Sequence, residues 1–89
     1  MKPLIIDVRE PAEYAGSHLP GAINVPAGAF MSQNLPVELT TADKDQPIVL
    51  YCRSGQRSNT CIQILKQLGF KNLTNGINEG QVSKLLSRL

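Results

Sequence analysis

The sequence predicts an α/β domain built on a small parallel sheet. Short apolar segments rich in β-branched residues alternate along the chain with segments of helical periodicity, and no segment is repeated. With 89 residues, 42% of them hydrophobic, the chain can form one core, which predicts a single domain over residues 1–89. Strands this apolar are buried on both faces, so we expect about four of them with helices on either side.

Four segments are predicted to be strands. Residues 47–51 give the strongest signal, and residues 4–8 form a similar apolar run. Residues 22–25 lie between a Pro-Gly turn and a second proline, which favours a short strand. Residues 72–74 supply the last strand.

Three short helices are predicted first. Pro11 suits the first position of a helix that ends by Gly16. Residues 28–32 and 35–39 are expected to be helical as well, and the polar residues 40–46 are expected to form a surface loop.

Two longer helices are predicted from apolar stripes at positions i, i+3, i+4 and i+7. The stripes consist of Cys61, Ile64, Leu65 and Leu68 in one helix and of Val82, Leu85, Leu86 and Leu89 in the other. Gly69 can end the first helix, and Asn78 can cap the second with Gln81 at its third position.

Composition excludes several classes of function. Nine Lys and Arg residues against seven Asp and Glu residues give a net charge of +2, which is too small and dispersed for a nucleic-acid surface. No apolar run approaches the ~20 residues that cross a bilayer, and residues 1–4 lack the apolar segment of a secretory signal. The expectation is a cytoplasmic monomer that binds neither nucleic acid nor membranes. A periplasmic location stays open if a signal peptide has been removed.

The loop after residues 47–51 carries the chemistry. Cys52 lies where a strand gives way to a helix, whose first turn has unpaired N–H groups and about half a positive charge. Arg53 and Arg57 add positive charge, and Gly55 lets successive amides point inward. The pKa of Cys52 should therefore lie below ~8.5, which makes it a nucleophile. Arg57 opposes the helix dipole and needs a partner, either a bound anion or the Cys52 thiolate.

Other reactive side chains are assigned structural roles. Cys61 fits the apolar stripe of its helix and should pack in the core. The nine-residue separation of the cysteines matches neither a zinc pair nor a redox pair, so free thiols and no metal are expected. Asp7 should accept backbone hydrogen bonds while Arg9 pairs with Glu13.

Two further side chains beside the predicted site are also assigned structural roles. His18, the only histidine, is predicted to fix a turn rather than to act as a base. Tyr51 should point into the core. The opposite possibility, that Cys52 itself is only a small buried hydrophobe, is disfavoured by the charged loop around it.

Two segments resemble the signature motifs of rhodanese domains. Residues 7–14 (DVREPAEY) together with residues 18–26 (HLPGAINVP) are similar to the first motif. Residues 52–58 (CRSGQRS) are similar to the active-site loop. The motifs have the family's order and separation, and the resemblance covers nearly the whole chain.

This resemblance implies a fold, a reaction and a set of site residues. Cys52 would attack thiosulfate or another sulfane-sulfur donor to give a persulfide, with Arg57 as the second catalytic residue. Cyanide, a thiol or a partner protein would then accept the sulfur, with no cofactor. The residues implied to bind substrate are Arg53, Ser54, Gly55, Gln56 and Ser58. The two arginines resemble the loop that prefers thiosulfate over mercaptopyruvate.

The chain departs from the family pattern in two places. The family usually has a strand and a helix before the first motif, so one edge strand is expected to be absent. Where the family commonly has paired glycines and an aromatic residue, residues 75–79 read Asn-Gly-Ile-Asn-Glu. That rim is expected to bind an acceptor differently.

Two alternative functions remain open. A non-catalytic rhodanese-like binding module is disfavoured by the presence of Cys52 and both loop arginines. A cysteine phosphatase or an arsenate reductase-like enzyme would also seat a cysteine in an amide-lined loop. Phosphatases of this kind have five residues between Cys and Arg, whereas four separate Cys52 from Arg57.

Overall fold

The computed structural model describes residues 2–87, whose four strands form one parallel sheet in the order β2-β1-β3-β4. The strands are β1 (Leu4–Asp7), β2 (Ile23–Asn24), β3 (Ile48–Tyr51) and β4 (Leu73–Ile77). The predicted α/β fold with a four-stranded parallel sheet is thereby confirmed.

Five helices connect and flank these strands within residues 2–87. They are α1 (Pro11–Gly16), α2 (Ala27–Met31), α3 (Val37–Thr40), α4 (Gln56–Gln67) and α5 (Glu79–Leu86). Most boundaries differ from expectation by one or two residues, and the larger differences are that β4 continues past residue 74 and that α4 begins within residues 52–58. The cap of α5 is confirmed, since Asn78 Oδ1 accepts from Gln81 N at 2.9 Å. Leu89, predicted for the stripe of α5, lies outside the described residues.

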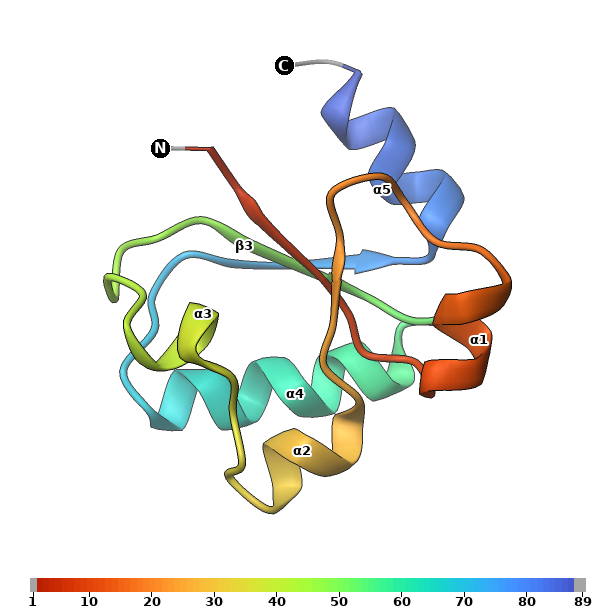
Figure 1. Cartoon of the computed structure of the whole chain (residues 1–89). Coiled ribbons are helices and arrows are strands. Elements are labelled where there is room, and N and C mark those ends of the chain that lie inside the picture. The colour runs from red at the N-terminus through yellow and green to blue at the C-terminus, as the bar shows by residue number, and fades with distance from the viewer. Residues whose placement is uncertain (1, 88–89) are drawn as a thin grey trace.

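Helices cover both faces of the sheet (Figure 1). On one face α2, α3 and α4 bury Phe30, Leu39 and Leu65 against β1 and β3. On the other face Val82 of α5 packs with Tyr51 and Leu19. None of the helices in residues 2–87 is both long and apolar enough to cross a membrane.

A β-bulge disturbs the pairing of β3 with β4. Leu50 is paired with Asn75 but Tyr51 is paired with Ile77, so Gly76 is the extra residue. Bulges bend a strand and redirect its side chains, often beside an active site. The bulge lies at the carboxyl end of β3, where parallel sheets place their ligands.

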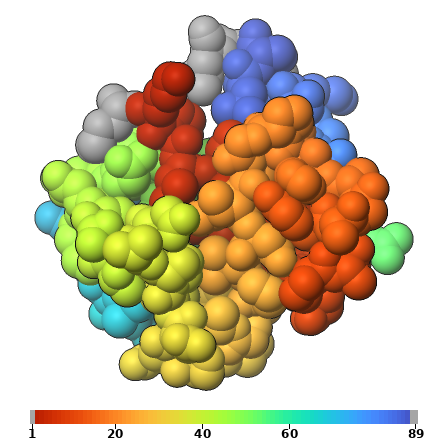
Figure 2. All heavy atoms as spheres, in the orientation of Figure 1, coloured from red at the N-terminus to blue at the C-terminus, as the bar shows by residue number. Residues whose placement is uncertain are grey.

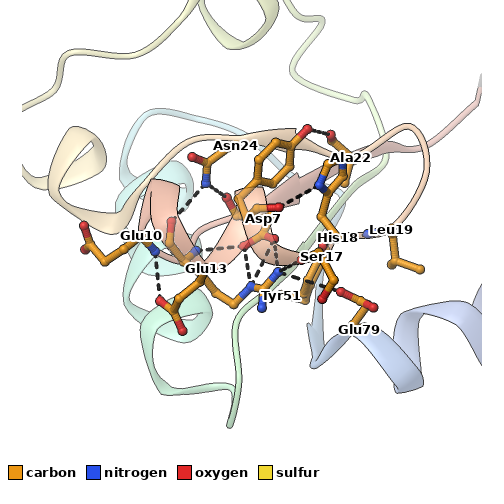
Figure 3. A network of polar contacts seen from close by, with 12 residues as sticks. Asp7, Glu10, Glu13, Ser17, His18, Leu19, Ala22, Asn24, Tyr51 and Glu79 are labelled. Carbon is orange, nitrogen blue, oxygen red and sulfur yellow. Dashed lines mark hydrogen bonds and ion pairs between the residues drawn. The ribbon is translucent and has the colours of Figure 1, made fainter.

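A buried carboxylate organises the neighbouring end of β1 (Figure 3). Asp7 is fully buried and accepts from Arg9 Nη2 at 2.7 Å and from Arg9 N at 2.9 Å. Arg9 also donates to the carbonyl of Ser17 at 2.6 Å. The predicted pairing of Arg9 with Glu13 is therefore wrong, because a carboxylate buried two residues away requires the guanidinium.

The segment between α1 and β2 is held by aromatic side chains (Figure 3). His18 stacks on Tyr14 with ring centroids 3.6 Å apart, and the hydroxyl of Tyr14 donates to Ala22 O at 2.6 Å. Tyr51 is fully buried, as predicted, and its hydroxyl accepts from Leu19 N at 3.3 Å. Burial raises the pKa of Tyr51 to about 12. His18 therefore lies in the turn where it was predicted and packs against Tyr14.

Candidate active site

Cys52 lies at the carboxyl end of β3 and is 2% exposed. Its backbone N–H donates to Ile77 O at 3.1 Å, which ties the cysteine to the end of β4. Its Sγ accepts from Gly55 N at 3.0 Å. The thiol is therefore enclosed by the first turn of the loop that follows it.

Gly55 makes this hydrogen bond possible. The residue has φ of +91° and precedes the first residue of α4. Positive φ is accessible to glycine without the penalty that a Cβ atom brings, so the chain reverses here and aims amides at the sulfur. Gly55 thus acts through its backbone, as the sequence suggested.

The surroundings of Cys52 favour its thiolate. Burial alone would raise the pKa, but the backbone N–H group of Ser58, the nearby Ser58 side chain and the backbone N–H groups of Ser54 and Gly55 outweigh this effect and lower the pKa to about 7. Cys61 is free like Cys52, and burial raises its pKa to about 12. The two thiols therefore differ in reactivity, as their sequence contexts indicated.

Alkylation by iodoacetamide should reveal this difference. Since thiolate is the reactive form, modification of Cys52 should accelerate roughly tenfold per pH unit below 7 and level off above it. Peptide mass mapping should find Cys61 unmodified in the folded protein. In urea both thiols should react with midpoints near ~8.5. A midpoint near 8.5 in the folded protein as well would contradict the site geometry.

Arg57 is paired with a carboxylate from α1. Its Nη1 donates to Glu13 Oε1 at 2.8 Å and its Nη2 donates to Glu13 Oε2 at 3.3 Å. Hydrogen bonding to Arg57 lowers the pKa of Glu13 to about 2, and Glu13 in turn raises the pKa of Arg57. Glu13 is thus a partner of Arg57 that the sequence-based interpretation, which named a bound anion or the Cys52 thiolate, did not include.

Glu13 has a second role that joins α1 to the loop. Its Oε1 also accepts from Glu10 N at 3.0 Å, which caps α1. In Figure 2 the segment after β3 emerges at the right-hand rim beside the orange atoms of α1. The Glu13 carboxylate therefore holds the guanidinium of Arg57 next to the first turn of α1.

The remaining predicted residues divide into exposed and buried groups. Arg53, Ser54 and Gln56 are exposed, with Arg53 and Ser54 directly after the nucleophile. Ser58 is fully buried, and its Oγ lies 3.6 Å from Cys52 Sγ. The structure thus brings Cys52, Gly55 and Ser58 into contact.

Two residues of this constellation were missed by sequence reasoning. Glu13 could have been found as the third helical residue after a proline, although its partner lies 44 residues away. Asn75 was assigned to an acceptor-binding rim. Its side chain instead donates to Gly55 O at 3.0 Å and accepts from Ser58 Oγ at 2.7 Å, so it supports the cysteine loop.

Among residues 2–87, no three His, Cys, Asp or Glu side chains gather closely enough to hold a metal ion. The backbone N–H of Gly55 donates to Cys52 Sγ, and such N–H groups suit an anion.

A parallel α/β sheet with an amide-lined cysteine loop after a central strand defines a class of anion-binding, thiolate-based domains. The model of the rhodanese-like domain matches residues 1–82, so the chain belongs to that family. A rhodanese with anions from E. coli has a similar solved structure, with a TM-score of 0.75 and 28% identity. That match covers 90% of this chain and 91% of the other.

Two curated relatives to which the chain is similar are sulfurtransferases. It is 35% identical over 72 residues to a sulfurtransferase of Allochromatium vinosum, covering 81% of this chain and 63% of the relative. It is 31% identical over 70 residues to the thiosulfate sulfurtransferase PspE of Escherichia coli, covering 79% and 64%. The chain therefore spans less than two thirds of the length of either relative.

Proposed function

We propose that this domain is a sulfurtransferase that carries sulfane sulfur as a persulfide on Cys52. The observation that carries the proposal is the 3.0 Å hydrogen bond from Gly55 N to Cys52 Sγ, in a loop whose backbone N–H groups lower the pKa of the thiol to about 7. A thiolate attacks sulfur readily, and the same N–H groups can hold the negative terminal sulfur of a persulfide.

The transfer has two balanced steps. The Cys52 thiolate attacks the outer sulfur of thiosulfate, the S–S bond of the donor breaks, and sulfite leaves with the electron pair. The terminal persulfide sulfur is then attacked by a nucleophile, which regenerates the Cys52 thiolate. With cyanide as the nucleophile the product is thiocyanate. No external oxidant or reductant enters either step.

The surroundings of Cys52 support a small donor with terminal sulfur. Because the cysteine is only 2% exposed, small reagents whose reacting atom is terminal have the easiest access to Sγ. Thiosulfate and low-molecular-weight persulfides are reagents of this kind. A thiol or a partner protein with an exposed thiol is the corresponding class of natural acceptor.

Intact-mass analysis tests this function. After incubation with thiosulfate, we expect the protein to gain the mass of one sulfur atom, with the gain mapping to the peptide that contains Cys52. Cyanide should remove the added mass and release thiocyanate. A protein with a reactive Cys52 that shows no mass gain with thiosulfate or a persulfide donor would reject the proposal.

Arg57 is proposed to hold the charged part of the donor while Glu13 orients its guanidinium. The Arg57→Ala variant should lower kcat/KM for thiosulfate by roughly 10- to 100-fold, as expected from loss of a charge-assisted hydrogen bond. Steady-state thiocyanate formation measures the effect. Lys66→Ala, which removes an exposed charge from the last turn of α4, is the matched control. An equal loss in both variants would attribute the effect to overall charge.

A further inference from the structure

Asn75 makes three side-chain hydrogen bonds beside the cysteine loop. Its Oδ1 accepts from Ser58 Oγ at 2.7 Å and from Ile77 N at 3.0 Å. Its Nδ2 donates to Gly55 O at 3.0 Å. One amide side chain of β4 thus contacts both the first turn of α4 and the residue before it.

The orientation of this amide is fixed by its partners. The backbone N–H of Ile77 can only donate, and the carbonyl of Gly55 can only accept. The Asn75 oxygen must therefore face Ile77 and Ser58, while its nitrogen faces Gly55. Reversing the amide would replace attraction by repulsion at Ile77 and Gly55.

This orientation also determines where the Ser58 hydroxyl hydrogen lies. Ser58 Oγ and Asn75 Oδ1 are 2.7 Å apart, a separation that two acceptors do not adopt. The carbonyl of Gly55, at 3.2 Å from Oγ, already accepts from Asn75 Nδ2 and from Asn59 N. The single hydrogen of Ser58 is therefore directed at Asn75.

A hydroxyl held in this way turns lone pairs toward Cys52. At 3.6 Å from Sγ, Ser58 Oγ can accept weakly from a thiol but cannot donate to a thiolate. If Ser58 were free to rotate, its hydroxyl could donate to the anionic sulfur and stabilise it further.

We propose that Asn75 is a positioning residue that turns the Ser58 hydroxyl away from the sulfur of Cys52. The anionic sulfur is then held by backbone N–H groups alone and keeps more of its nucleophilicity, because over-stabilised thiolates attack more slowly. The role of this arrangement in catalysis rests on the proposed sulfur transfer. The orientation of the Ser58 hydroxyl is a property of the protein without a sulfur donor and does not depend on that function.

The effect of Ser58→Ala on the pKa of Cys52 tests this arrangement in three backgrounds. In the wild-type background, where the hydroxyl does not donate to sulfur, Ser58→Ala should leave the pKa unchanged or lower it. In the Asn75→Ala background the hydroxyl loses its nearest acceptor and can donate to the thiolate, which attracts a donor more strongly than the neutral carbonyl of Gly55. Ser58→Ala should therefore raise the pKa by about 0.5 to 1 unit. The pH dependence of iodoacetamide alkylation gives each value.

Asn75→Asp provides the conservative background. An aspartate keeps an acceptor for Ser58 and Ile77 but loses the donor to Gly55, so Ser58→Ala should again fail to raise the pKa. This pattern separates the orientation of the hydroxyl from support of the loop. The proposal would be overturned if Ser58→Ala raised the pKa of Cys52 in the wild-type background. It would also be overturned if Ser58→Ala failed to raise this pKa in the Asn75→Ala background.

These measurements remain interpretable for two reasons. Arg57 and Cys61 of α4, which interact electrostatically with Cys52, are unchanged in every variant. The charge that Asn75→Asp adds is present with and without Ser58→Ala, so it cancels when the two are compared. The wild-type arm needs no substitution at Asn75, so it can overturn the proposal even if Asn75→Ala does not fold. Alkylation also requires no sulfur donor, which separates failure of this inference from failure of the proposed function.

Discussion

Cys52→Ser should reduce sulfur transfer from thiosulfate to cyanide by at least about a thousandfold. The serine hydroxyl can still accept from Gly55 N, so the loop should keep its shape, but it remains protonated at neutral pH and does not form a persulfide. Thiocyanate formation and intact mass should both show the loss. Circular dichroism and the melting temperature should stay close to those of the wild-type protein.

Cys61→Ala is the control for this substitution. Cys61 is also a fully buried thiol, on α4 among apolar side chains, so its loss should affect stability more than turnover. If the Cys52→Ser variant retained sulfur transfer, Cys52 would not be the nucleophile of the reaction. Loss of turnover in a folded Cys61→Ala protein would show that the second thiol takes part.

Gly76→Ala should destabilise the fold by about 3 kcal/mol, near the upper end of overpacking penalties. A Cβ atom on Gly76 would lie 2.2 Å from Val82 Cγ2 and 3.1 Å from Val49 Cγ1, with the carbonyl of Leu50 at 3.3 Å. Since Val82 is fully buried, α5 has to shift away from the sheet. Thermal unfolding should show a fall of at least about 10 °C.

Gly28→Ala is the matched control for this change. Gly28 is a helical residue of α2 and has nothing within 4 Å of an added Cβ atom, so alanine should stabilise the helix slightly. Adding Val82→Ala to Gly76→Ala should also cost less than the sum of the two changes, because the shared clash disappears. Equal destabilisation by Gly76→Ala and Gly28→Ala would contradict this packing.

The strands and helices were largely predictable because their signals are local. The apolar run of β3 and the apolar stripe of α4 each lie within one segment of the sequence. The extent of β4 was not predictable in this way, because Asn75 and Gly76 have low strand propensity. Pairing with β3 carries the strand through them, and the bulge that accommodates Gly76 depends on that pairing.

Partners of charged side chains were the least predictable feature of the site. Glu13 is four residues from Arg9, and this spacing on its own favoured their pairing. The structure assigns Arg9 to Asp7 and leaves Glu13 for Arg57. The cysteine loop could be located from the sequence because its strand, its glycine and its arginines are adjacent in sequence. The Asn75 contact depends on two segments that meet only after folding.

The ion pair between Glu13 and Arg57 has a consequence for how the domain responds to acid. A carboxylate whose folded-state pKa is about 2 stays ionised well below its usual 4.5, so its contribution to stability is complete above about pH 4.5 and is lost progressively as the pH falls from there through about 2. Arg57 remains protonated over the same range. Acidification to pH 5 should therefore protonate Cys52 and slow its chemistry, while the ion pair between Glu13 and Arg57 stays intact.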